Sequence, residues 1–157
     1  MKFKMLAAFM AVVPILTFTG AISAQADDEV RTDAAAMLAE AVRMEQLFAE
    51  LYNNRQFEEL GARYYAEDAI VIPPNTEPVR GRADIVEYFR SVRDAFGEVK
   101  MGEPLRSSTS GSLVSLVGQA SAHNGQLRAV MHELYERQAD GSLLAVHDAF
   151  SFRDPLR

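Results

Sequence analysis

The sequence contains no cysteine among its 157 residues, and basic residues are in the minority. The absence of cysteine excludes disulfide bonds, thiolate catalysis, cysteine-based zinc sites and the attachment of a lipid to a cysteine. The 16 Lys and Arg residues stand against 22 Asp and Glu, which makes the formal net charge -6. This acidic balance argues against a nucleic-acid partner, because binding to phosphates requires clustered Lys and Arg side chains.

Several signatures of cofactor and metal chemistry are also missing. The sequence has no Gly-rich phosphate loop, no G-x-S-x-G and no H-E-x-x-H motif. It has no internal repeat, no low-complexity tract and no linker. A hydrophobic content of 48% with 24% charged residues is typical of a globular protein, and the length fits one domain. We therefore expect a single domain that uses neither a cofactor nor a metal ion.

The first 26 residues are typical of a cleavable signal peptide. Lys2 and Lys4 give the chain a positive start, and residues 5–18 form an apolar run. Ala24-Gln25-Ala26 then forms an A-x-A cleavage pattern. We expect residues 27–157 to be the mature domain, and to be periplasmic or secreted.

The alternative interpretation of this segment is an uncleaved membrane anchor. The run up to Ala24 approaches the roughly 20 apolar residues that a membrane-spanning helix needs. Pro14, Gly20 and the cleavage pattern favour the signal peptide over the anchor. After cleavage we expect no attachment to a membrane.

The first half of the mature chain has the periodicity of amphipathic helices. Apolar residues recur at helical spacing in three segments, at residues 33–52, 56–64 and 83–96. Asn53 and Asn54 mark the end of the first segment, because Asn tolerates the left-handed conformation that often follows a helix. We expect three helices in this half of the chain.

The second half changes to the periodicity of strands. Glycine-containing turn signals separate the β-prone segments, and Asn124-Gly125 and Asp140-Gly141 are strong hairpin signals. The expected strands cover residues 69–72, 99–107, 113–122, 126–137 and 143–153. Helices followed by long antiparallel strands predict an α+β fold with the helices on one face of the sheet.

One local stretch carries a family resemblance. Tyr65–Val71 reads YAEDAIV and is followed by Pro73 and Pro74, by PVRGR at residues 78–82 and by Ile85. This stretch resembles the nuclear transport factor 2-like superfamily, in its SnoaL-like and ketosteroid-isomerase-like branch. The order of elements resembles that superfamily over the whole mature chain.

The resemblance implies a cone-shaped fold in which three N-terminal helices pack on a curved, mainly antiparallel sheet. It also implies a cavity that takes a small hydrophobic molecule, and a homodimer formed through the outer sheet face. Members include isomerases, cyclases, dehydratases and association domains, so the fold by itself does not specify the function.

The last two predicted strands bring two acidic residues together. A two-residue or four-residue turn around Asp140-Gly141 makes paired positions sum to 281. The facing pairs are then Met131 with Phe150, Glu133 with Asp148, and Tyr135 with Val146. Opposed, buried carboxylates would share one proton near neutral pH, which suits acid and base roles.

Two alternatives to this hypothesis remain open. A loop with an odd number of residues would shift the register, and the two acidic residues would then not need to share a face. A buried acidic pair is also compatible with a structural network held by Arg or Tyr side chains.

The resemblance bears on these residues individually. In ketosteroid isomerases, the positions of the helix-one tyrosine, the general base and the protonated aspartate fall here at Ala49, Pro73 and Glu133. Steroid isomerisation by that route is therefore not expected. SnoaL-like cyclases place an acid/base aspartate on the final strand, where Asp148 lies. We therefore predict Asp148 as the first catalytic candidate and Glu133 as the second.

The resemblance also implies cavity positions on the helical side for Tyr65 and Phe89, whose alternative role is that of core aromatics. The predicted substrate-binding residues are Tyr65, Phe89, Met131, Tyr135, Val146 and Phe150.

The histidines are expected away from this site. His132 and His147 alternate with the acidic pair, so they would be diagonal neighbours on the outer sheet face. We expect them at a dimer interface or on the surface, and His123 exposed beside a turn, with no metal site.

Two functions remain open from the sequence. One is an exported, cofactor-independent enzyme of the isomerase, cyclase or dehydratase type that uses Asp148 and Glu133 for proton transfer. The alternative is a non-catalytic binding or homo-oligomeric association module.

Overall fold

The computed structural model describes the backbone of residues 19–153 and the side chains of residues 33–153, Asn124 excepted. Residues 1–32 and 33–157 separate into two compact units, and the fold described below is that of the second unit. The predicted signal peptide falls on residues 1–18, outside the described part, and on residues 19–26, whose side chains are outside it. Within the described residues, no helix is long and apolar enough to span a bilayer.

Three helices precede most of the sheet, as the periodicity predicts. They are α1 (Thr19–Asn53), α2 (Phe57–Tyr64) and α3 (Arg82–Phe96). The second and third match their predicted ranges within about one residue, and α1 ends at the predicted asparagine. Its N-terminal end, Thr19, is fourteen positions earlier than the predicted start at residue 33.

The sheet is mixed and mostly antiparallel. Its order is β2-β1-β7-β6-β5-β3, with β4 also paired to β5, and only the β1–β7 pair is parallel. The predicted α+β class is therefore confirmed. The strands are β1 (Tyr65–Ile72), β2 (Val79–Arg80), β3 (Val99–Met101), β4 (Arg106–Ser110), β5 (Leu113–Ala122), β6 (Leu127–Arg137) and β7 (Leu143–Arg153).

The strand predicted over residues 99–107 is wrong as one element. It divides into β3 and β4, which both pair with β5. Gly102 and Pro104 lie in the interruption, and proline cannot donate a hydrogen bond to a ladder. The division bends this edge of the sheet around β5, so two short strands cover the length of one long one.

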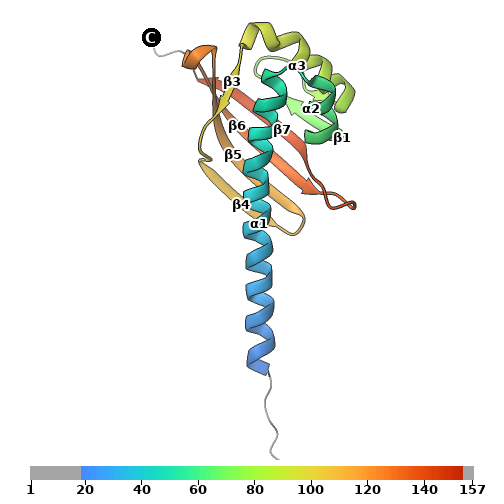
Figure 1. The fold of residues 1–157 in the computed structure, drawn as a ribbon, viewed down its shortest axis with the longest axis vertical. Helices are drawn as coiled ribbons and strands as arrows, with labels where there is room; N and C mark the ends of the chain where they lie inside the picture. The colour runs from blue at the N-terminus through green and yellow to red at the C-terminus, as the bar shows by residue number, and fades with distance from the viewer. Residues whose placement is uncertain (1–18, 154–157) are drawn as a thin grey trace, which may run out of the picture. The chain divides into compact units, whose positions relative to one another are not determined.

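The helices cover one face of the sheet (Figure 1). A cluster of aromatic side chains fills the space between the two layers. Phe48 of α1 lies at its centre, with ring centroids 5.2 Å from those of Tyr64 and Phe89 and 5.6 Å from that of Tyr52. Each fully buried large apolar side chain stabilises the fold by roughly 1.5–3 kcal/mol. This cluster positions α1 and α3 over the sheet.

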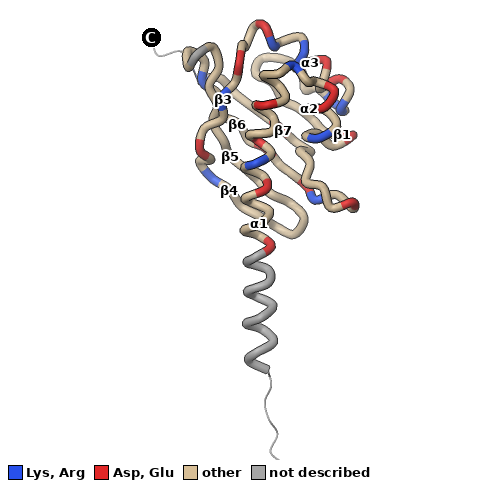
Figure 2. Tube along the Cα trace, viewed as in Figure 1, with Lys and Arg blue, Asp and Glu red and all other residues tan. Residues whose placement is uncertain are grey.

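Polar contacts at the rim of the domain join the layers. The guanidinium of Arg137 donates to both carboxylate oxygens of Glu40 on α1, at 2.6 and 3.0 Å. Arg90 of α3 pairs with Glu58 of α2 at 2.5 Å, but both side chains are exposed and such pairs contribute little. Charged residues of both signs are interspersed over α3 and its neighbouring turns (Figure 2).

The β6–β7 hairpin has an odd loop and a bulge that compensates for it. The backbone N–H of Gln138 bonds to the carbonyl of Ser142, which leaves a three-residue loop between them. Near the loop the strand register is therefore shifted by one residue from the predicted one, and Tyr135 faces Ala145. A bulge at Val146 then restores the predicted register. The predicted Tyr135–Val146 pair is wrong for this reason, whereas Met131–Phe150 and Glu133–Asp148 are confirmed.

Candidate functional site

Two carboxyl groups lie directly opposite each other on the concave face of the sheet. Glu133 of β6 pairs with Asp148 of β7, and their residues are 1% and 5% exposed. Burial to this degree is unusual for acidic residues and demands an explanation from their surroundings. Both residues line the same cavity, which lies between the helices and the sheet.

The cavity has a volume of about 60 Å³ and a largely apolar wall. Its wall combines aromatic residues of α1 and α3 with inward-facing residues of β3, β5, β6 and β7. Among the described residues, no Lys, Arg or His side chain lines it. The wall includes Phe48, Tyr52, Phe89, Phe96, Met131 and Phe150.

A tyrosine hydroxyl holds Asp148. The Tyr65 hydroxyl donates to Oδ2 of Asp148 at 2.7 Å, and Tyr65 is fully buried. A second buried pair joins the hydroxyls of Tyr64 and Tyr135 at 2.7 Å. The oxygen Oε2 of Glu133 is buried and has no hydrogen-bond partner among the described residues. The two carboxyl groups therefore have different surroundings.

These surroundings act differently on the pKa values of the two carboxyl groups. Burial raises the pKa of Asp148 to about 6, and the hydrogen bond from Tyr65 opposes that rise. Burial, and then the charge of Asp148, raise the pKa of Glu133 well above its ordinary value. The hydrogen bond from Tyr65 favours the ionised form of Asp148, and the charge of Asp148 favours a protonated Glu133, so the pair can supply a base and an acid in one site.

The predicted substrate-binding residues divide into two groups. Phe89, Met131 and Phe150 line the cavity as expected. Tyr65, Tyr135 and Val146 do not line it. The Tyr65 hydroxyl is hydrogen-bonded to Asp148, and the Tyr135 hydroxyl is hydrogen-bonded to that of Tyr64. The bulge at Val146 interrupts the alternation that would have pointed this side chain inward.

A third buried acid, Glu45 of α1, was missed by the sequence reasoning. It is 1% exposed, and neither of its carboxylate oxygens has a hydrogen-bond partner among the described residues. Burial, and then the charge of Asp148, raise its pKa to about 7. A signal was present, because Ala41 and Ala49 lie four residues before and after Glu45 and place it on the packed helix face.

Tyr52 was also missed as a cavity residue. It is 1% exposed and lines the cavity, and its hydroxyl has no partner among the described residues. The guanidinium of Arg93 lies over its ring, 5.2 Å from the centroid. An unpaired hydroxyl in an apolar wall could accept or donate a hydrogen bond to a bound molecule.

The histidines lie where the alternation predicts. The rings of His132 and His147 are 6.3 Å apart, on the sheet face opposite the acidic pair. His123 is exposed, and its ring nitrogen contacts the carbonyl of Ala95 at the end of α3. In the part of the chain that the structure describes, no group of three or more His, Asp or Glu side chains is arranged to hold a metal ion.

Comparisons with known proteins agree with this fold. The SnoaL-like domain family matches residues 44–156, which is more than half of the chain. A search of curated proteins gives no match.

Solved structures show the same fold at low sequence identity. An NTF2-like protein with a cystatin-like fold from Novosphingobium aromaticivorans has a TM-score of 0.66 and 15% identity, covering 88% of this chain and 94% of that one. A Catenulispora acidiphila protein in complex with S-DNPA has a TM-score of 0.63 and 18% identity, covering 75% and 94%. A ketosteroid isomerase-like protein from Erwinia carotovora atroseptica has a TM-score of 0.57 and 16% identity, covering 72% and 93%.

Proposed function

Because the chain belongs to the SnoaL-like domain family, we propose that it binds a small apolar molecule and transfers protons on it without a cofactor. The observation that carries this proposal is the placement of Glu133 and Asp148, side by side in the wall of an apolar cavity. A buried acid and a buried base at one point of a pocket are the groups that an isomerisation requires.

The roles follow from the surroundings of each carboxyl group. Asp148, whose ionised form is stabilised by the Tyr65 hydroxyl, takes a proton from a carbon of the substrate. The electron pair of that carbon–hydrogen bond moves toward a substrate carbonyl, and Glu133 donates its proton to the carbonyl oxygen. Asp148 then gives its proton to another carbon of the substrate, and Glu133 takes back the proton from the oxygen. These transfers complete an isomerisation and leave the number of protons on the two residues unchanged.

A simple ketone tests this function without knowledge of the natural substrate. Exchange of the protons next to the carbonyl of cyclohexanone is followed by NMR in D₂O, with the protein present. We expect the wild type to accelerate exchange, and Asp148→Asn to lower the rate by about 100-fold or more, since a positioned base contributes that much. Asp68→Asn is the matched control, because Asp68 is an exposed aspartate on β1.

The same experiment separates catalysis from binding. Saturable binding of cyclohexanone without accelerated exchange would replace the enzyme with a non-catalytic binding module. Normal exchange by a folded Asp148→Asn would remove the catalytic role of that residue.

We also propose a homodimer formed through the outer sheet face. Val117, Val130 and Leu134 alternate with inward-facing neighbours and are half-buried, and they lie outside the hydrophobic core. A row of apolar side chains on an otherwise open sheet face suits a second copy of the chain. Export through cleavage after Ala26 remains a proposal that rests on the signal pattern alone.

A further inference from the structure

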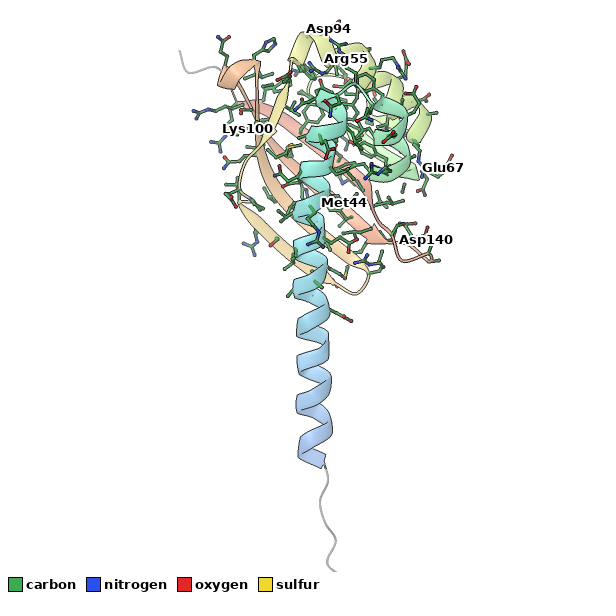
Figure 3. The ribbon with its side chains drawn as sticks, viewed as in Figure 1. Met44, Arg55, Glu67, Asp94, Lys100 and Asp140 are labelled. Carbon is green, nitrogen blue, oxygen red and sulfur yellow. The ribbon has the colours of Figure 1, made fainter. Side chains whose placement is uncertain are left out.

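Glu45 makes the acidic pair into a group of three. It lies in α1 directly after Met44, which is labelled in Figure 3 and is 8% exposed. Its side chain points into the protein, and both of its oxygens lack partners among the described residues. A carboxyl group buried in this way destabilises a fold if it is ionised, so a residue without a role would be expected to be replaced by an apolar one.

A glycine in the sheet makes room for this carboxyl group. A Cβ atom at Gly118 would overlap Oε1 of Glu45, because it would lie closer than Cβ atoms come to non-bonded neighbours. The backbone of β5 at Gly118 is therefore in direct contact with the Glu45 carboxyl group. An alanine or any larger residue at this position would force the carboxyl group to move.

The strand register places this contact beside the acidic pair. Gly118 faces Met131, and Leu116 faces Glu133, so Gly118 and Glu133 are diagonal neighbours on the concave face. Glu133 in turn faces Asp148. The three carboxyl groups thus come from α1, β6 and β7 and gather over adjacent strands.

We propose that Glu45 is a positioning residue of the acid–base site, which acts through Glu133 and keeps that residue protonated while Asp148 is ionised. This inference rests on the proposed function of the other two acids. Its physical basis is that neighbouring carboxyl groups in a medium of low dielectric constant cannot all ionise, so each negative charge strengthens proton binding at the others.

Among the described residues, no buried cation pairs with these three carboxyl groups. Among the described residues, the buried charged groups on the elements packed against α1 are Glu133, Asp148 and Arg93, and at the rim Arg137 is paired with Glu40. The Arg93 guanidinium donates to the main-chain carbonyl oxygens of Tyr52 and Asn53, at 3.2 and 3.3 Å, and forms no ion pair with the acids among the described residues. Repulsion among the carboxyl groups is therefore relieved by protons, and once Glu45 ionises, its charge strengthens proton binding at Glu133.

Titration of the carboxyl groups tests this role directly. Side-chain carboxyl signals of ¹³C-labelled protein are followed by NMR from pH 4 to 10, and Glu133→Gln identifies the signal of Glu133. In Glu45→Gln we expect the titration midpoint of Glu133 to fall by about one pH unit, because one neighbouring negative charge is removed. Glu50→Gln, an exposed change on the same helix, should leave that midpoint unchanged.

A second readout connects the titration to the reaction. The upper limb of the pH profile for cyclohexanone exchange should move to lower pH in Glu45→Gln, whereas a purely structural role would lower the rate equally at every pH. If Glu45→Gln does not fold, Gly118→Ala displaces the same carboxyl group and should shift the midpoint in the same direction.

The outcomes separate the two proposals. An unchanged Glu133 midpoint in Glu45→Gln overturns the inference, even if the wild type catalyses exchange. A shifted midpoint in a protein that binds cyclohexanone but exchanges no protons overturns the proposed function, and with it the catalytic part of the inference.

Discussion

The hydroxyl of Tyr65, at the start of β1, donates a 2.7 Å hydrogen bond to Oδ2 of Asp148 on β7. These two strands form the parallel pair of the sheet, and Tyr65 faces Ala145 in that ladder. The bond therefore links the end of the helical half of the chain to the last strand. It also determines how strongly Asp148 holds a proton, because a donor to a carboxylate favours its ionised form.

Removal of this hydroxyl should alter the pH profile. The Tyr65 hydrogen bond lowers the pKa of Asp148, so Tyr65→Phe should raise that pKa from its present value of about 6. The lower limb of the pH profile for cyclohexanone exchange should then move to higher pH. Urea unfolding should show a loss of about 1–3 kcal/mol, the usual effect of leaving a buried acceptor unpaired. Tyr88→Phe is the control, and identical profiles in the two variants would show that the bond does not tune Asp148.

Glu45 should make the folded state less stable as the pH rises. Its pKa is raised from 4.5 to about 7, so the folded state binds more protons than the unfolded state between those values. The free energy of unfolding should therefore fall across this window, by about 3 kcal/mol for this residue alone. Urea unfolding of wild type and Glu45→Gln at pH 5 and pH 8 measures the difference.

The other two buried acids act in the same direction, so Glu45→Gln should reduce the pH dependence of stability without abolishing it. Glu50→Gln should reproduce the wild-type dependence, because Glu50 is exposed on the same helix. Equal dependence in all three proteins would contradict the assignment of a proton to Glu45.

Gly118→Ala should destabilise the protein through Glu45. The new methyl group would overlap Oε1 of Glu45 and approach Cε of Met131 at 3.2 Å. Both atoms end flexible side chains that can shift, so we expect a loss of about 1 kcal/mol, the lower end of the range for overpacking. Combining it with Glu45→Ala should recover part of that loss, because the clashing carboxyl group is gone. A double-mutant cycle by urea unfolding gives the coupling energy, and additive losses would contradict the contact.

The outer sheet face should mediate association. Leu134→Arg places a charge among the half-buried apolar residues of this face, so we expect the variant to elute as a monomer where the wild type is a dimer. Light scattering after size-exclusion chromatography measures the mass. Ala62→Arg, an exposed change on α2, is the control. A monomeric wild type at micromolar concentration would contradict the proposed dimer.

Export should produce a defined N-terminus. Expression of the whole chain in a Gram-negative host should yield periplasmic protein that begins at Asp27, because the A-x-A pattern ends at Ala26. Mass spectrometry of the purified protein measures the cleavage position. Ala24→Leu with Ala26→Leu should block processing, and retention of Met1 in the wild type would favour the membrane-anchor alternative.

The sequence by itself determined the kinds of elements and most of their bounds. Helical spacing, alternation and turn residues are local properties, so they predict α2, α3, β5 and β7 within about one residue. Alternation also predicted that Glu133 and Asp148 lie inward and that His132 and His147 lie outward. These predictions hold because side-chain direction along a strand repeats every two residues.

Tertiary structure alone decided how the site is assembled. The loop after Arg137 has an odd number of residues and shifts the β6–β7 register by one residue, and the bulge at Val146 shifts the register back. Glu133 and Asp148 therefore face each other because of a compensation that the turn residues did not predict. The contact between Glu45 and Gly118 joins residues 73 positions apart, and no local pattern relates them. Local preferences determine which face a side chain occupies, whereas packing between distant segments determines which side chains meet, and through burial, which of them hold a proton.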